Sequence, residues 1–392
     1  MDSNKKNITI LFSTLVIVMM GFGMIIPILP FYIKSFGASG GSMGFLMAAY
    51  STMQFLFAPI WGSLSDRYGR KPLLLLGVTG NAIAMVFSGL ASSLWLLVAS
   101  RALAGMLSSA TLPTAMAFIG DSTSEEDRGG GMGLMGAAMG VGMVLGPGLG
   151  GWLAEGNLST PFYLAAGLSV IALLAIWLFL PESLPPEKRN QAQSTRGPDF
   201  RQMWDALFSP IGILLLLAFL LSFGMTNFES IFGIYALEKF SYGPKDVGMI
   251  LTVIGIVSSI MQGALVGPAT KKWGETAIIR ASLLGSSVGF LVMLLAYNYT
   301  TVLITVSLFI ISTAMLRPAV SSLISRRAGK IGQGTAMGLN NSFMSLGRIV
   351  GPLWAGFIFD IQLYLPYLSG SVIMFAGFLL SIARLEKGEK DA

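Results

Sequence analysis

Long apolar stretches recur along the whole chain, with short polar loops between them. A helix of about 20 apolar residues is long enough to cross the hydrocarbon core of a bilayer. The pattern predicts twelve such helices, at residues 8–33, 42–64, 72–92, 94–119, 130–154, 161–181, 208–235, 245–267, 276–297, 301–325, 333–358 and 364–384. Runs such as Ile211–Leu217 do not alternate apolar and polar side chains, as strands of a membrane barrel would. We therefore expect an all-α membrane protein with twelve transmembrane helices.

The composition agrees with a protein that has lipid as its solvent. Of 392 residues, 54% are hydrophobic and 11% are charged, whereas soluble domains carry about 25% charged residues. The chain has no Cys and no His, which excludes disulfides, thiolate or imidazole metal sites and a Ser-His-Asp triad. It also lacks the glycine-rich phosphate loop of an ATP-driven pump. We expect no enzyme activity, no cofactor and no metal.

The basic residues predict the orientation of the chain. With an even number of spans, 19 of the 25 Lys and Arg residues fall on one side, and only Lys34, Lys239 and Lys245 on the other. Because Lys and Arg accumulate in cytoplasmic loops, both termini should lie in the cytoplasm, with the helices in a bacterial cell membrane. The net charge of +6 is scattered over many short loops. It therefore reflects topology and does not predict nucleic-acid binding.

A polar, Pro-rich stretch at residues 182–207 divides the spans six and six. We interpret it as a cytoplasmic linker, with one surface helix near Phe200–Phe208, between an N-terminal half at 1–181 and a C-terminal half at 208–392.

The two halves repeat at a constant offset of 205 positions. The matched features are Gly62 and Gly69 with Gly267 and Gly274, Pro113 with Pro318, Glu155 with Asp360, and Gly142, Gly146, Pro147, Gly150 and Gly151 with Gly347, Gly351, Pro352, Ala355 and Gly356. Small residues at this spacing also serve ordinary helix packing, but packing alone does not explain the shared offset. Repeated six-helix halves are typical of secondary transporters that bind substrate between them.

The segment Gly62–Pro72 resembles the loop signature of the major facilitator superfamily. In that family the loop latches the two halves together in the outward-facing state, which implies this role for Gly62, Asp66, Arg67, Gly69, Arg70 and Lys71. A plain positive-inside loop is the alternative. The copy in the second half, at Lys271–Gly274, has no Asp.

The resemblance extends to the family's drug:proton antiporter branch. Gly142, Gly146, Pro147, Gly150 and Gly151 match the antiporter pattern of the fifth span, which implies a leak-preventing interface between the halves, with ordinary helix packing as the alternative. Gly21–Pro30 is similar to the branch's first-helix motif, and Arg101 to its buried arginine, although Ala104 stands where the branch has Gln.

Phe223–Ser230, Leu316–Ala319 and Gln54 resemble the NorA/Bmr-type group of bacterial multidrug efflux transporters, in which these segments line the cavity. That group has an Asp where this chain has Ala314.

Glu229 is the carboxylate that lies well inside a predicted span. A charge at this depth costs at least about 2.5–3.5 kcal/mol, so it should face water or a partner. Burial favours the protonated form of a carboxylate, so Glu229 could exchange a proton near neutral pH and attract a cationic substrate. A static ion pair with an arginine is the alternative. We expect Arg317 to sense Glu229, because spans 7 and 10 both line the cavity in the family, and we predict no role for Arg348.

Several aromatic and apolar residues are candidates for lining a substrate cavity. We expect Phe22, Ile26, Phe228 and Phe232 to line it together with Glu229, Arg317, Arg101 and Gln54, although lipid-facing or packing roles remain open for the aromatic residues.

The predicted function is proton-coupled export of lipophilic, often cationic, drugs by a monomer that contacts membrane lipid. A narrower exporter of a tetracycline-like drug, a sugar or a lipid precursor is the alternative. A transporter fold that acts as a sensor without flux is a third hypothesis. Arg101, Arg317 and Arg348 all fall inside predicted spans. Their excess positive charge favours a rival hypothesis, in which the substrate is anionic or neutral.

Overall fold

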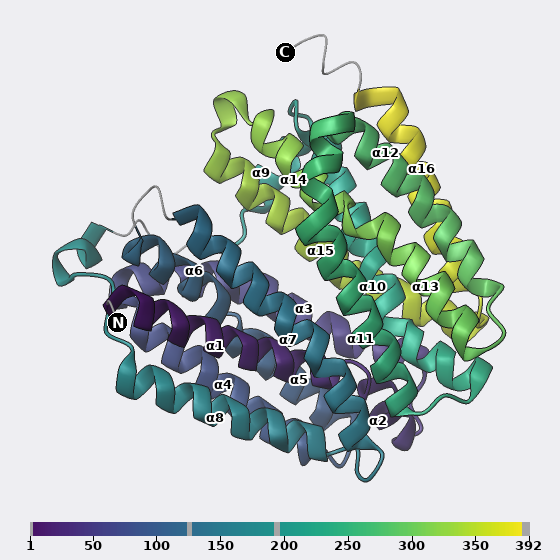
Figure 1. Ribbon diagram of the computed structural model, residues 1–392, viewed down its shortest axis with the longest axis horizontal. Helices are drawn as coiled ribbons and strands as arrows, with labels where there is room; N and C mark the ends of the chain where they lie inside the picture. The colour runs from purple at the N-terminus through teal and green to yellow at the C-terminus, as the bar shows by residue number, and fades with distance from the viewer. Residues whose placement is uncertain (1–2, 124–127, 192–196, 386–392) are drawn as a thin grey trace. The chain divides into compact units, whose positions relative to one another are not determined.

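The computed structural model describes residues 3–123, 128–191 and 197–385, and every regular element in these ranges is a helix (Figure 1). Residues 192–196 of the predicted linker lie outside the described residues. The first half contains α1 (Ser3–Ile25), α2 (Leu29–Ser35), α3 (Gly40–Tyr68), α4 (Arg70–Gly89), α5 (Leu94–Ser108), α6 (Thr111–Ser122), α7 (Arg128–Ala154) and α8 (Thr160–Phe179). A 3₁₀ turn (Pro186–Gln191) and α9 (Phe200–Leu207) follow. The second half contains α10 (Gly212–Phe240), α11 (Pro244–Ile260), a π-helical turn (Met261–Leu265), α12 (Val266–Leu294), α13 (Tyr299–Ala314), α14 (Leu316–Arg326), a 3₁₀ turn (Gly329–Ile331), α15 (Gln333–Ile361) and α16 (Leu365–Leu385).

Eleven helical stretches in the described ranges are long and apolar enough to cross a membrane. One of them, Pro244–Leu294, has 51 residues and contains two predicted spans. At about 1.5 Å per residue it would extend about 77 Å, more than twice a hydrocarbon core of about 30 Å. The helix is interrupted at Gly274, which has φ 76° and ψ 159°. This stretch therefore accounts for two spans, which agrees with the twelve predicted, and the protein is a multi-pass membrane protein.

Three predicted spans are broken where continuous helices were expected. The span 8–33 divides into α1 and α2 around Pro27, with Pro30 in the first turn of α2. The span 94–119 divides into α5 and α6, and the span 301–325 into α13 and α14. Pro113 and Pro318 lie in the first turns of α6 and α14. Proline has no amide hydrogen to donate to the preceding turn, so a helix restarts there at little cost.

The described chain forms two compact units. Unit 1 contains residues 1–38, 49–198 and 242–252, and unit 2 contains residues 39–48, 199–241 and 253–392. In unit 1, α1 packs against α7 and α8, and α4 packs against α5 and α8 (Figure 1). In unit 2, α10 packs against α15 and α16, and α12 packs against α13 and α16. The two units therefore repeat one packing pattern, as the sequence offset predicts.

Glycines set the closest helix contacts in each unit. On α7, a Cβ atom added at Gly146 would lie 2.6 Å from the carbonyl oxygen of Met20 and 2.9 Å from the Cα of Gly23 on α1. On α15, one added at Gly351 would lie 2.7 Å from the carbonyl oxygen of Phe223 on α10. Gly142 and Gly150 make the same kind of contact with α1, and Gly347 with α10. The repeated glycine motif thus packs each of these helices against the first long helix of its own half.

Candidate functional site

Glu229 lies in the middle of α10, and its side chain is partly exposed, whereas Phe228 and Ser230 beside it are buried. Among the described residues, no hydrogen bond or ion pair holds its carboxylate. The charge that acts on Glu229 is that of Arg348 on α15. Arg348 donates a hydrogen bond of 3.0 Å to the hydroxyl of Ser345. An electrostatic neighbour without a direct bond leaves the carboxylate available to a proton or a cation.

Arg317 is exposed at the start of α14. No interaction between Arg317 and Glu229 is found in the described part of the chain. Arg348, for which sequence reasoning predicted no role, is the arginine placed to sense Glu229. The glycine contacts of Gly347 and Gly351 explain this placement, because they bring α15 close to α10. The signal available in the sequence was that Arg348 directly follows a motif glycine.

A second group of candidate residues gathers in unit 1. The rings of Phe22 on α1 and Tyr50 on α3 lie 5.6 Å apart, and the guanidinium of Arg101 lies over the Tyr50 ring at 4.7 Å. Arg101 is 1% exposed, and its Nε and Nη1 atoms have no hydrogen-bond partner within the described residues. Ile26 and Gln54 lie one turn beyond Phe22 and Tyr50, and both are partly exposed. A buried guanidinium keeps its charge, so this cluster would favour a hydrogen-bond acceptor or an anionic group.

Phe228 and Phe232 belong to the interior of unit 2. They are 2% and 3% exposed, with ring centroids 5.1 Å apart. Phe228 also packs against Phe309 at 5.2 Å, and Phe309 against Phe290 at 4.6 Å. This aromatic stack favours the packing interpretation of both residues over substrate contact.

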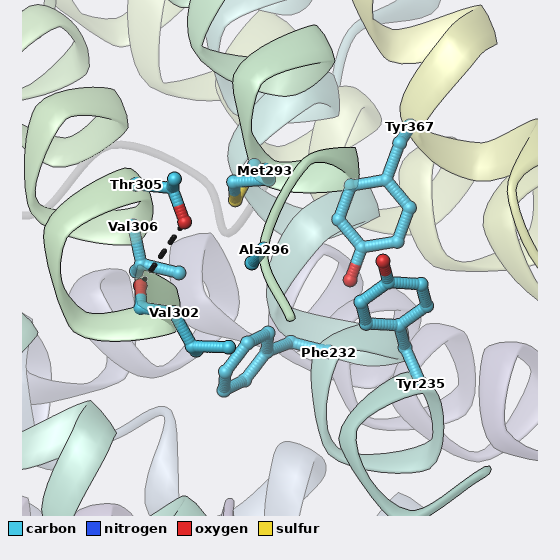
Figure 2. Close-up of a pocket in the computed structure, with 8 residues that line it drawn as sticks. All are labelled: Phe232, Tyr235, Met293, Ala296, Val302, Thr305, Val306 and Tyr367. Atoms are coloured by element: carbon cyan, nitrogen blue, oxygen red, sulfur yellow. Dashed lines mark hydrogen bonds between the residues drawn. The ribbon is translucent and has the colours of Figure 1, made fainter. Parts of the chain in front are cut away.

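A small pocket lies beside this stack, between α10, α12, α13 and α16. Figure 2 shows the rings of Phe232, Tyr235 and Tyr367 around it, with Met293 and Thr305 opposite. Its cavity volume is about 10 Å³, enough for about one water molecule. The pocket is therefore too small to be the drug site.

The predicted latch loop contains a charge network centred on Arg70. The guanidinium of Arg70 donates to Asp121 at 2.9 Å, to Ser65 at 2.7 Å and to Asp66. Gly69 joins α3 to α4 with φ 107°, a conformation that favours glycine. Arg67 lies over the Tyr68 ring at 5.5 Å. All these residues belong to unit 1, so the contacts fix the loop within that unit.

A carboxylate caps the helix that follows this loop. Glu182 accepts hydrogen bonds from the backbone nitrogens of Arg70 at 2.8 Å and Lys71 at 3.2 Å, at the start of α4. Arg189 lies 3.8 Å from Glu182. The ammonium of Lys71 donates to the carbonyl of Trp177 at 2.9 Å. Sequence reasoning missed Asp121 and Glu182, because each is 50 residues or more from the loop.

The second half has an ion pair at the positions equivalent to Arg70 and Asp121, with the two charges exchanged. Glu275 stands 205 positions after Arg70, and Arg326 stands 205 positions after Asp121. They form an ion pair of 2.8 Å, and Ser322 donates to Glu275 at 3.1 Å. The Gly274 turn before Glu275 matches the Gly69 turn. The loop of the second copy therefore has an ionic contact, although it lacks the Asp.

Glu155 and Asp360 occupy equivalent places in the two units. Glu155 follows α7 and lies 3.5 Å from the ammonium of Lys245 at the start of α11. Asp360, near the end of α15, accepts hydrogen bonds of 2.8 Å from the backbone nitrogens of Gly40 and Gly41 at the start of α3. Each acid thus holds the first turn of a helix, where negative charge is favourable.

Comparison with known proteins identifies the family. The family model described as "Major Facilitator Superfamily" matches residues 11–352 and also residues 214–391. This chain belongs to the major facilitator superfamily. It is therefore a membrane transporter and not an enzyme.

Similar proteins cover nearly the full length of the chain. It is 31% identical over 388 residues to multidrug resistance protein 2 of Bacillus subtilis, covering 98% of this chain and 97% of the relative. It is 29% identical over 378 residues to the quinolone resistance protein NorA of Staphylococcus aureus, covering 96% of each chain. Among solved structures, the human organic anion transporter MFSD10 matches with a TM-score of 0.71 and 25% identity, covering 96% of this chain and 99% of that one.

Proposed function

We propose that this transporter exports small lipophilic, often cationic, drugs in exchange for protons. The names of the relatives support drug export, since both bacterial proteins are resistance proteins that match end to end. The partly exposed carboxylate of Glu229, which has no direct partner in the described residues, is the observation that carries the proton coupling. A proton and a cationic drug would compete for this carboxylate. Exchange follows from that competition, because the release of one favours the binding of the other.

Arg348 would set the charge balance of this site. When Glu229 is ionised, the nearby Arg348 offsets its charge, and when Glu229 is protonated, a positive charge remains. A bound cation is then repelled by Arg348, which would favour its release. This arrangement uses the proton to change the charge of the site by one unit, without a metal or cofactor.

Exchange also requires the site to open to each side in turn. A Cβ atom added at Gly151 on α7 would lie 3.1 Å from the Cα of Gly248 on α11, and one added at Gly356 on α15 would lie 3.1 Å from the Cα of Gly41 on α3. Toward the opposite ends of α7 and α15, a Cβ atom at Gly133 or Gly338 would meet no described atom within 4 Å. We infer that labels at these two glycines report the change of state, because alternating access moves the two halves against each other. Single Cys labels at 133 and 338 should therefore change their reactivity when the state changes.

The cell membrane, with both termini in the cytoplasm, is the proposed location. The asymmetric Lys and Arg distribution supports this orientation. The carboxylate-capped loop that contains Asp66 and Arg70 would then be cytoplasmic, and Glu155 and Asp360 would lie at the outer end.

Transport in proteoliposomes tests the function directly. The purified protein is reconstituted, a pH gradient is imposed, and movement of a lipophilic cation such as ethidium is followed by fluorescence. We expect gradient-driven movement that stops when a protonophore collapses the gradient, and the same behaviour with several unrelated drugs. Transport of one compound class alone would support the narrower exporter instead. Absence of flux for every compound would contradict the proposal.

Export of organic anions or zwitterions is a second candidate. The fully buried Arg101, with two unpartnered nitrogen atoms in the described part of the chain, is the observation that favours it. The similar human structure is of an organic anion transporter. A carboxylate on the substrate would provide the acceptor that Arg101 lacks. Competition between ethidium and a carboxylate-bearing fluorescent anion in the same vesicles would distinguish the two candidates.

A further inference from the structure

The short helix α9 carries an exposed aromatic stripe. Phe200, Trp204 and Phe208 follow one another at intervals of four residues and are 61%, 64% and 79% exposed. Residues four apart lie on one face of a helix. The rings of Trp204 and Phe208 touch edge to face at 5.7 Å. Phe200 and Trp204 lie on one face of α9, and Phe208 directly follows its last residue, so the three side chains form a surface that water solvates poorly.

The rest of α9 is firmly placed. Met203 and Ala206 are buried on the opposite side, where α9 packs against α10 and α15 within unit 2. The side chain of Asp199 caps the helix by accepting from the backbone nitrogen of Gln202 at 3.0 Å. The connection to α10 is four residues long, and Gly212 donates to the carbonyl of Ser209 at 2.9 Å. The aromatic stripe is therefore held in a fixed position at the start of α10.

The length of α10 indicates how deep in the membrane α9 lies. A helix of 29 residues extends about 43 Å at 1.5 Å per residue, which matches the roughly 40–45 Å of a bilayer including its headgroup layers. The start of α10 therefore lies at the level of the headgroups, and a helix joined to it by four residues lies there too. Trp is enriched at this level, because its ring has an apolar body and a polar nitrogen.

We propose that α9 is an interfacial helix whose Phe200, Trp204 and Phe208 side chains insert into the boundary between lipid headgroups and acyl chains. Lipid is the occupant that fits, because the stripe continues from a lipid-spanning helix and its polar neighbours Arg201, Gln202 and Asp205 remain exposed to the aqueous side. Anchored in this way, α9 fixes the depth of the start of α10, the helix that carries Glu229. This inference does not depend on the substrate or on the proton coupling.

Single Cys variants can test the proposal, because the chain has no native Cys. Nitroxide labels are placed at Trp204→Cys and Phe208→Cys, with Gln202→Cys on the polar side of α9 as the matched control. Each variant is reconstituted in vesicles of phosphatidylethanolamine and phosphatidylglycerol. Collisions with oxygen, which dissolves in lipid, are compared with collisions with a water-soluble nickel chelate. We expect an oxygen-to-nickel ratio several-fold higher at 204 and 208 than at 202.

A second measurement keeps all other side chains native. Lipids brominated near the headgroup should quench the emission of wild-type protein more than that of Trp204→Phe, and the difference reports Trp204 itself. Equal nickel access at 202, 204 and 208 would place the stripe in water and overturn the proposal. Spin–spin broadening at 204 that disappears on dilution in lipid would show that a second copy covers the stripe, which would also overturn it.

Discussion

Replacing Gly146 by Ala should loosen the contact between α1 and α7. An added Cβ atom would lie 2.6 Å from the carbonyl oxygen of Met20 and 2.9 Å from both the Cα of Gly23 and the nitrogen of Met24. All three atoms are backbone, so no side chain can rotate away. Ordinary contacts begin at 3.4 Å, so the two helices would have to separate locally by about 0.8 Å at the tightest point, a strain that overpacking measurements put at about 1–3 kcal/mol.

Gly136→Ala on the same helix is the matched control. Its Cβ atom would meet no described atom within 4 Å, so only the helix-forming advantage of Ala remains, up to about 1 kcal/mol. The two variants should therefore change stability in opposite directions. Each kcal/mol shifts the midpoint of thermal unfolding by roughly 2–4 °C for a unit of this size.

Thermal unfolding of the purified protein in one detergent, followed by tryptophan fluorescence, provides the measurement. We expect Gly146→Ala to unfold at least about 2 °C below Gly136→Ala, given that per-kcal shift and a difference of about 1–4 kcal/mol. Equal midpoints, or a higher midpoint for Gly146→Ala, would refute the claim that the motif glycines set the distance between these helices.

Two further predictions concern the loop glycines and the charge next to Glu229. Gly69→Ala should destabilise the protein more than Gly274→Ala, although both positions have positive φ, because only the Cβ at Gly69 would collide with the Glu182 carboxylate. Both costs should be of the order of 1–3 kcal/mol for the backbone conformation alone, and equal midpoints of thermal unfolding would show that Glu182 does not restrict the loop. Arg348→Gln should retain export of a cationic drug but release it more slowly at low external pH, measured as a slower efflux phase in proteoliposomes, and an unchanged phase would exclude Arg348 from the charge balance.

Much of the fold follows from residue patterns along the chain. The long apolar stretches predicted twelve spans, and the features repeated at an offset of 205 positions predicted two similar halves. The surface helix near Phe200 was also predicted correctly, as α9. The broken helices around Pro27 and Pro318 were not predicted, because apolar content is the same on both sides of each break and proline is compatible with either a kink or a new helix start.

The sequence was enough to propose candidate site residues, but it did not reveal their contacts. Glu229 was identified because a carboxylate inside an apolar span is costly. Its electrostatic neighbour Arg348 was not, because the distance between helices depends on which glycines face each other. The partners of Arg70 lie 51 and 112 positions away along the chain, and charge alone does not reveal such pairs. Phe228 and Phe232 were expected to line the cavity. An aromatic residue in a helix is compatible with both packing and substrate binding, so the sequence does not distinguish these two roles.

Proton-coupled transport by Glu229→Gln is the most direct test of the central claim. Glu238→Gln, near the end of the same helix, serves as the control, since its side chain is exposed. Both variants are reconstituted, and drug movement is followed after a pH jump and during drug-for-drug exchange without a gradient. The account predicts that Glu229→Gln loses the response to the pH jump, while Glu238→Gln responds like the wild type. A full response to the pH jump in Glu229→Gln would contradict the account.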